Sequence, residues 1–195
     1  MVTGLVLAAG TGRRLGHPKA EVVVRGQRLI DRVVEVLLEG GCGQVRVVVR
    51  EASIAPRTAR AVVNPHPERG LGSSLRAGLA GLDSAACLIA LVDQPDITAA
   101  EVRAVIGAFR GGAVLVAARR AGRRSHPVLL SRAFFAEVAE SADGDQGARA
   151  FLDGRADLIE SLDFDDMIDI DTPADLARFR SLGSGPVGLA RSTDR

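Results

Sequence analysis

Short apolar runs alternate with longer amphipathic segments along this chain, and that alternation restricts its fold more than any other feature. Runs typical of buried strands cover residues 4–8, 45–49, 61–63, 86–92 and 113–117. Helical spacing of apolar residues covers 28–39, 73–82 and 98–109, and Thr98 and Glu101 are spaced as a capping box. Strands that alternate with helices indicate βαβ units, so we expect an α/β fold with a mainly parallel, twisted sheet.

The pattern becomes less regular in the last third of the chain. We expect strands at 127–130 and 158–162, helices at 132–140 and 147–152, and a last helix that Thr172 caps and Pro173 opens. Residues 1–182 then form one domain, while the composition of residues 183–195 predicts a mobile tail.

Composition limits the classes of partner. The formal net charge of +1 and the 3% of aromatic residues argue against a nucleic-acid partner. No stretch approaches the ~20 apolar residues of a membrane span, and the first residues lack the pattern of a secretion signal. We therefore expect a cytoplasmic protein without a membrane partner. Cys42 and Cys87 lack metal-ligand spacing, which predicts two buried, reduced thiols.

The first apolar run leads into a glycine-rich loop with the sequence Leu7-Ala8-Ala9-Gly10-Thr11-Gly12-Arg13-Arg14-Leu15-Gly16, and Lys19 follows closely. Glycines allow successive N–H groups to converge on anionic oxygens. Arg14 and Lys19 add full positive charge, so the loop predicts a polyphosphate ligand. The dinucleotide fingerprint fails because Leu15 stands at its third glycine, and the P-loop fails because His17-Pro18 follows Gly16. A sharp turn would explain the glycines but not the two cations.

Carboxylates follow two later segments. Asp93 ends a buried strand, where ligands of open parallel sheets bind, and a carboxylate there suits Mg²⁺. Asp169 and Asp171 would point the same way in an extended segment, so two carboxylates can face one cation. Asp96 instead favours the N-terminus of the next helix, and the acidic residues 163–166 are expected to be solvated.

These motifs resemble those of nucleoside-triphosphate-dependent nucleotidyltransferases. The loop at 7–19 is similar to their triphosphate-binding signature. Four further motifs resemble those of the MobA-like subgroup, which attaches CMP or GMP to molybdopterin. They are residues 64–78, Asp-Gln-Pro at 93–95, Gly-Asp-Gln-Gly-Ala-Arg at 144–149 and Asp-Ile-Asp-Thr-Pro at 169–173. Residues 122–127 resemble its acceptor-side loop, with Ser125 in place of a glycine. The resemblance spans residues 5–176 in the order of the family.

The resemblance implies a three-layer α/β/α sandwich of the nucleotide-diphospho-sugar transferase type, which is Rossmann-like, with its active site at the carboxyl edge of the sheet. It implies a Mg²⁺-dependent transfer of a nucleoside monophosphate to a phosphorylated acceptor, with release of pyrophosphate. The residues that it assigns to catalysis are Arg14, Lys19 and Asp93. Those that it assigns to the nucleotide are Leu7, Ala8, Ala9, Gly10, Gly12, Arg14, Lys19, Asn64 and Ser74. His126 and Arg149 would bind the acceptor, and Asp93 and Asp171, or Asp169 in its place, would hold Mg²⁺.

The substrates follow from finer details of the resemblance. Guanylyl-transferring relatives carry Gly-Gly where this chain has Ala8-Ala9, so CTP is favoured over GTP. Molybdopterin is the favoured acceptor, with methylerythritol phosphate or a sugar phosphate as alternatives. Ser73 and Ser74 can also be read as plain serine capping of the helix. An alternative of another class is a non-catalytic nucleotide-binding partner of a molybdoenzyme.

Overall fold

The computed structural model describes residues 1–181, and it is built on a seven-stranded sheet with the order β5–β4–β1–β6–β8–β7–β9. The strands are β1 (Val2–Leu7), β4 (Gln44–Val49), β5 (Arg60–Val63), β6 (Ala86–Leu91), β7 (Leu115–Arg120), β8 (Arg123–Ser131) and β9 (Ile159–Asp163). β8 pairs antiparallel with β6 and β7, and the other pairs are parallel. The expected mainly parallel sheet is confirmed. The tail expected at 183–195 lies outside the described residues.

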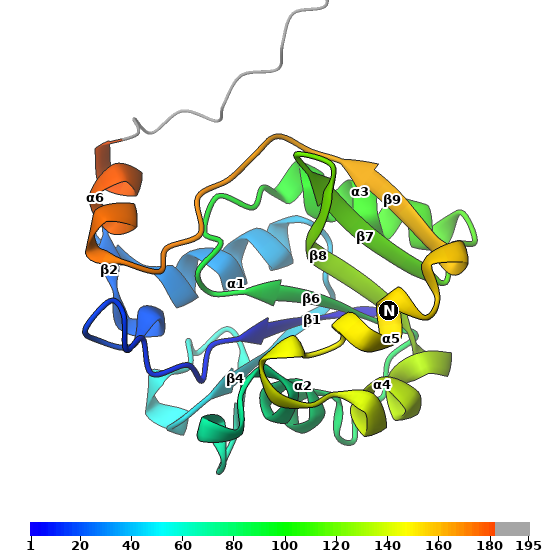
Figure 1. Ribbon diagram of the computed structural model, residues 1–195, viewed down its shortest axis with the longest axis horizontal. Coiled ribbons are helices and arrows are strands. Elements are labelled where there is room, and N and C mark those ends of the chain that lie inside the picture. Colours follow the sequence, from blue (N-terminus) through cyan, green and yellow to red (C-terminus); the bar gives the residue numbers. More distant parts are fainter. Residues whose placement is uncertain (182–195) are drawn as a thin grey trace, which may run out of the picture.

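Helices cover both faces of the sheet (Figure 1). α1 (Leu29–Glu39), α3 (Ala99–Arg110) and α6 (Pro173–Ser181) contribute to one hydrophobic cluster. α2 (Leu71–Leu79), α4 (Phe135–Ser141) and α5 (Arg149–Asp153) contribute to the second. The predicted three-layer sandwich is therefore confirmed.

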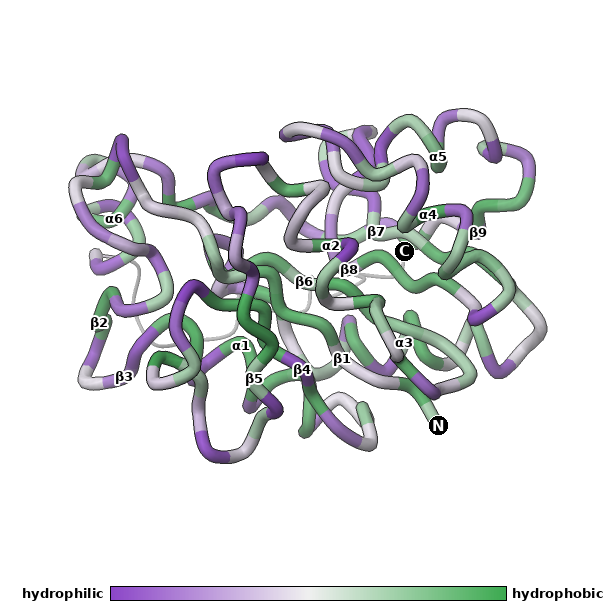
Figure 2. Tube along the Cα trace, turned by 90° about the horizontal axis from the view of Figure 1, so that it is seen from below, coloured by the Kyte–Doolittle hydropathy of each residue, from purple (hydrophilic) through white to green (hydrophobic). Residues whose placement is uncertain are grey.

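The two-residue period of the strands builds these two clusters. In β1, Val6 belongs to the first cluster, whereas Leu5 and Leu7 belong to the second. All three side chains are at most 6% exposed, so β1 is buried on both faces, as expected of a central parallel strand. Figure 2 shows the same arrangement, with hydrophobic strands in the middle and hydrophilic loops around them.

Local signals fixed most of the predicted boundaries. The capping box is present: Thr98 Oγ1 accepts from Glu101 N at 3.2 Å, and a Glu101 carboxylate oxygen accepts from Thr98 N at 2.9 Å. The helix predicted at 73–82 is present, but α2 begins two residues earlier, at Leu71, and ends at Leu79. The helix predicted at 132–140 divides into a 3-10 turn, η4 (Arg132–Phe134), and α4. Cys42 and Cys87 are buried and free, as predicted.

Two features were not predicted. A small hairpin of β2 (Val23–Val24) and β3 (Gln27–Arg28) precedes α1. Residues 122–127, expected to form a loop, instead lie mostly within β8. Ala121 and Gly122 both have positive φ, of 45° and 73°, and make the tight turn between β7 and β8. That turn is why β8 runs against its neighbours.

The sheet changes direction between β1 and β6, which are adjacent and parallel. The chain leaves β1 toward β4 and β5, and it leaves β6 toward β7 on the other side. Both strands end at the same edge, where Leu7 pairs with Leu91 (Figure 1). Ligands of open α/β sheets bind in the crevice at such a point. Among the described residues, no helix has the length and apolar character needed to cross a membrane.

Arg46 of β4 stabilises the end of α2. Its side chain is buried, and its guanidinium donates to the carbonyl oxygens of Gly78 at 3.3 Å, Ala80 at 2.9 Å and Gly81 at 2.9 Å. Gly78 belongs to the last turn of α2, whose carbonyls have no partner within the helix, and Ala80 and Gly81 follow the helix directly. Burial, together with the charge of Arg60 opposite it in β5, lowers the pKa of Arg46.

We predict that Arg46→Met lowers the free energy of unfolding by about 1–3 kcal/mol, because the carbonyls of the buried Gly78 and of Ala80 and Gly81 lose a charged donor. Arg60→Met is the matched control: it removes an exposed arginine from the register partner of Arg46 and leaves the helix end bonded. Urea unfolding of both variants measures the difference. Equal losses in the two variants would contradict this role.

Candidate active site

The loop after β1 folds back on itself at Gly12. This residue has a φ of +63°, and its carbonyl accepts from the N–H groups of Leu15 and Gly16, each at 2.9 Å. A Cβ at this position would lie 1.9 Å from the carbonyl oxygen of His17. Only glycine fits, so this turn sets the path that brings Lys19 back over the edge of the sheet.

Asp93 follows the neighbouring strand β6, and a distant segment is bonded beside it. The N–H of Ile170 donates to the Asp93 carbonyl at 2.9 Å. Residues 169–171 therefore lie next to the end of β6, although more than 70 positions separate them from it in the sequence. In Figure 1 the segment that leads to α6 passes the ends of β1 and β6.

Lys19 joins these segments. Its ammonium lies 2.7 Å from Asp93 Oδ2 and 2.5 Å from Asp171 Oδ1, and Arg14 Nη2 lies 3.0 Å from Asp171 Oδ2. The Lys19 side chain is 16% exposed, whereas that of Arg14 is 73% exposed. Burial lowers the pKa of Lys19, but the two carboxylates outweigh this and hold it above its ordinary value. The four residues to which the sequence assigned triphosphate and metal thus converge at one place.

The donor set suits a hard divalent cation. Oxygens of Asp93 and Asp171 face one point, and Mg²⁺ typically takes one or two carboxylates together with phosphate oxygens and water. Asp169 has another partner, because it accepts from Gln94 Nε2 at 2.9 Å. Burial and the charges of Asp93 and Asp171 raise the pKa of Asp169 against the effect of that hydrogen bond. Within residues 1–181 no group of three or more His, Cys, Asp or Glu side chains is arranged to hold a metal.

The segment predicted to meet the nucleoside is braced internally. Asn64 Nδ2 donates to the hydroxyls of Ser73 at 2.9 Å and Ser74 at 3.0 Å, and Asn64 Oδ1 accepts from the N–H of His66. Asn64 and Ser74 are 3% and 5% exposed. These bonds hold the loop before α2 against its first turn. The serine-capping alternative is wrong, because Gly70 is the N-cap of α2 and no side chain caps the helix.

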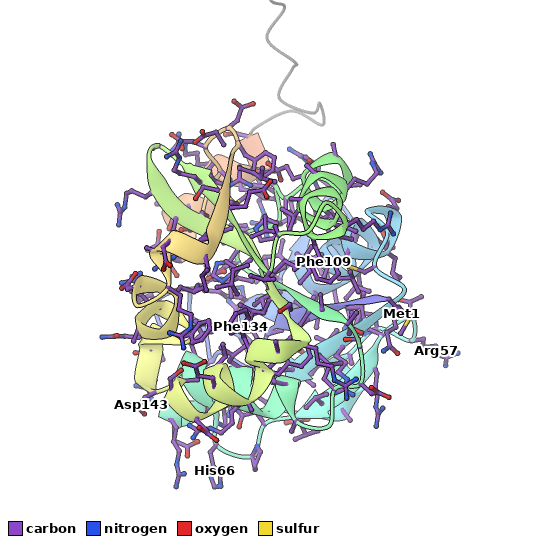
Figure 3. The ribbon with its side chains drawn as sticks, turned by 90° about the vertical axis from the view of Figure 1, so that its right-hand side faces the viewer. Met1, Arg57, His66, Phe109, Phe134 and Asp143 are labelled. Atoms are coloured by element: carbon purple, nitrogen blue, oxygen red, sulfur yellow. The ribbon has the colours of Figure 1, made fainter. Side chains whose placement is uncertain are left out.

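The first turn of α2 also packs tightly against the 3-10 turn η5 (Gly144–Gln146). Gly70 has a φ of +83°, and a Cβ there would lie 2.5 Å from the Gly144 carbonyl carbon. Figure 3 shows His66 and Asp143, which flank this contact, at the same lower end of the molecule. Two of the motifs singled out in the sequence, 64–78 and 144–149, are therefore parts of one wall.

A cavity of about 470 Å³ lies beside the cation cluster. Its lining combines apolar side chains of the sheet and helices with a polar rim that contains both predicted acceptor residues. The apolar part includes Leu7, Leu71, Leu75, Ile89, Leu91 and Val128, and the rim includes Arg123, Arg124, His126 and Arg149. Gln94 and Asp169 also line it, so their hydrogen bond connects the cavity with the cluster at Lys19.

His126 reaches the cavity because β8 bulges. Ala117 pairs with Val128 and the next residue, Ala118, pairs with Ser125, so His126 and Pro127 are extra residues in β8. Proline has no N–H to lose from the ladder, which makes a bulge a suitable place for it. Ser125, which stands where the family has glycine, fits because it is an ordinary strand position.

Burial lowers the pKa of His126 to about 4; Arg124 also lowers it, and the charge of Asp93 opposes the shift. The imidazole is therefore neutral at neutral pH. It can donate or accept a hydrogen bond but supplies no positive charge to an anionic acceptor.

Sequence reasoning missed two residues of the site, Gln94 and Arg120. Gln94 is 8% exposed, and its Oε1 has no partner among the described residues. Arg120 is 7% exposed, pairs with Glu101 at 2.9 Å and lies over the ring of Phe164. The alternation of β7 gave the only signal, because Arg120 shares a face of the strand with the buried Ala118.

The chain is similar to several known proteins. A sequence model of the MobA-like NTP transferase domain matches residues 4–160. Nicotine blue oxidoreductase of Paenarthrobacter nicotinovorans is 37% identical over 199 residues, covering 91% of this chain and 95% of that protein. A protein of Bacillus cytotoxicus named probable molybdenum cofactor guanylyltransferase is 33% identical over 113 residues, covering 54% of this chain and 56% of that protein.

Solved structures share the whole fold. The crystal structure of Rv0371c from Mycobacterium tuberculosis has a TM-score of 0.80 at 27% identity, covering 92% of this chain and 97% of that one. A structure of Rv0371c in complex with manganese has a TM-score of 0.77 at 25% identity, covering 93% and 99%.

We predict that His126 titrates with a midpoint near pH 4 when its imidazole signals are followed by NMR. With three histidines in the chain, His126→Gln assigns the signal. Arg124→Met should raise the midpoint and Asp93→Asn should lower it, because the two charges act in opposite directions.

The lowered pKa of His126 also makes the stability of the folded state depend on pH. The unfolded chain takes up this proton first, so His126 makes the folded state less stable as the pH falls from 6.5 toward 4. The His126→Gln variant should lose less stability over that window than the parent chain does. A midpoint near 6.5 in the folded protein would contradict the burial argument.

Proposed function

The chain belongs to the MobA-like NTP transferase domain family, which makes it a nucleotidyltransferase, and we propose that it transfers CMP from CTP to a phosphorylated acceptor, with molybdopterin as the favoured acceptor. The observation that carries the proposal is the convergence of Arg14, Lys19, Asp93 and Asp171 at the carboxyl ends of β1 and β6. Cations for a triphosphate and carboxylates for a divalent cation are brought together from three distant segments.

The reaction needs positioning and charge stabilisation more than a strong base. A phosphate monoester is already anionic near neutral pH, so its oxygen can attack the α-phosphorus directly. The bond from that phosphorus to its bridging oxygen breaks, and pyrophosphate leaves with the oxygen. Arg14 and Lys19 would bind the triphosphate and stabilise the leaving group, and the N–H groups of residues 9–12 would hold its oxygens.

Asp93 and Asp171 would hold the divalent cation, with Asp169 kept beside them by Gln94. A bound cation supplies neutralisation of the phosphate oxygens. The manganese complex of Rv0371c supports a divalent metal in a related protein, and we propose Mg²⁺ as the ion here.

The cavity beside the cluster suits the acceptor. Its apolar walls can bury a ring system, while Arg123, Arg124 and Arg149 offer charge to a phosphate at the rim. His126, which is neutral, would add one directed hydrogen bond. The relative named for molybdenum cofactor guanylyl transfer supports molybdopterin as the acceptor.

A pyrophosphate-release assay with purified protein, Mg²⁺, molybdopterin and either CTP or GTP tests the proposal. Asp93→Asn should lower kcat by about 100-fold or more, because a cation ligand is lost. The variant should still show a cooperative thermal unfolding transition. Asp83→Asn, at an exposed aspartate that pairs with Arg132 away from the site, is the control. Release that is unaffected by Asp93→Asn would remove this residue from catalysis.

The choice of nucleobase is tested at Ala8 and Ala9. Both are at most 4% exposed and pack into opposite hydrophobic clusters. Their methyl groups therefore determine how closely the backbone of residues 8 and 9 approaches the core. Replacing both by glycine should raise the ratio of GTP to CTP turnover about tenfold. Ala86→Gly removes a buried methyl group at the first residue of β6, away from the site, and should leave the ratio unchanged. An unchanged ratio in the double variant would place base recognition elsewhere.

The relative from P. nicotinovorans raises a second candidate, a redox reaction. The chain's own thiols are poor redox groups, because burial raises the pKa of Cys42 to about 12 and also raises that of Cys87. An external electron donor would be required. Oxidation of NADH or NADPH by the purified chain with an electron acceptor, and without pyrophosphate release from any triphosphate, would favour this function. Nucleotide binding without either reaction would favour a non-catalytic partner of a molybdoenzyme.

A further inference from the structure

The oxygens that would bind the cation are already bonded to Lys19. Its ammonium touches Asp93 Oδ2 and Asp171 Oδ1, at 2.7 Å and 2.5 Å, and Arg14 covers the other oxygen of Asp171 at 3.0 Å. The side chains of Lys19, Asp93 and Asp171 are 16%, 23% and 33% exposed, so solvent screens these pairs less than it screens surface pairs.

A divalent cation and the Lys19 ammonium cannot share these positions. Both need carboxylate oxygens of Asp93 and Asp171 at short distance, and the two cations repel each other. Three of these four oxygens are already paired with Lys19 or Arg14. The ammonium must therefore leave before the cation can bind both aspartates. Leaving would deprive a partly buried charge of its partners, which is costly unless another anion takes their place.

A triphosphate is such an anion. Lys19 begins the short helix η1 (Lys19–Glu21), and its flexible stem lets the ammonium swing to a neighbouring anion. The Arg14 side chain is 73% exposed, so its guanidinium can also move to bind the triphosphate. A monophosphate offers less charge and fewer oxygens, so it would compete poorly with two carboxylates.

We propose that Lys19 keeps Asp93 and Asp171 closed to divalent cations until the phosphates of a nucleoside triphosphate draw its ammonium away. Cation and triphosphate then bind reciprocally, each raising the affinity of the protein for the other. The proposal rests on the proposed function only in taking these two aspartates as cation ligands.

The experiment titrates the full chain with Mn²⁺ alone, without nucleotide or acceptor, and follows free Mn²⁺ by electron paramagnetic resonance. The parent chain should bind Mn²⁺ weakly. Lys19→Met removes the ammonium, keeps an apolar stem and should tighten Mn²⁺ binding at least tenfold. Arg13→Met removes a charge from the same loop, at a residue for which no ion pair is found within residues 1–181, and should change the affinity less than twofold.

Adding Asp171→Asn to Lys19→Met should abolish the gain, which ties it to this site. Affinity in Lys19→Met that is equal to or weaker than that of Arg13→Met overturns the proposal. Should Lys19→Met be unfolded without metal, Mn²⁺ is expected to restore a cooperative thermal transition, because the cation replaces the lost ammonium. Failure of Mn²⁺ to do so also overturns it.

The readout is separate from turnover. A chain that shows the Lys19 effect but releases no pyrophosphate supports the proposal while contradicting the proposed function. A chain that releases pyrophosphate but shows no Lys19 effect does the opposite.

Discussion

The ion pairs of Lys19 hold the carboxyl edge of the sheet together. One ammonium connects the loop after β1, the end of β6 and the segment before α6, which lie 74 and 152 positions from it in the sequence. The backbone bond from Ile170 to Asp93 fixes the same junction without charge. The remaining parts of the site take their positions from these contacts, because Gln94 follows Asp93 directly and Asp169 precedes Asp171 by two residues.

The site therefore has two halves with different physical character. The half around Lys19 is charged and held by paired ions, whereas the cavity is largely apolar and carries its arginines at the rim. Gln94 and Asp169 line the cavity and lie close to Asp93 and Asp171 in the sequence, so their hydrogen bond links the two halves. This division matches a reaction in which a polyphosphate and a bulkier acceptor must meet at one phosphorus atom.

Much of this arrangement could be predicted from local patterns. The capping box of α3 follows from residues three positions apart, and the meeting of Lys19 with Asp93 follows because parallel strands end at one edge. The β2–β3 hairpin could not be predicted, since two-residue strands show no period. Nor could the burial of Arg120, which depends on Glu101 and Phe164 from distant segments. Period-two spacing put Asp169 and Asp171 on one edge but could not say which would meet Gln94 and which Lys19.

The bulge at His126 and Pro127 has a consequence for how such a protein can diversify. The tip of the β7–β8 hairpin, from Arg119 to Ser125, is not paired with β6, because the register between β6 and β8 ends at Val128, whereas the end of β1 is paired with both β4 and β6. Insertions or substitutions in the tip can therefore reshape one wall of the cavity without shifting β1 and β6, the strands that precede Lys19 and Asp93. Evolution can thus vary this wall of the cavity while the half of the site around Lys19 is inherited unchanged.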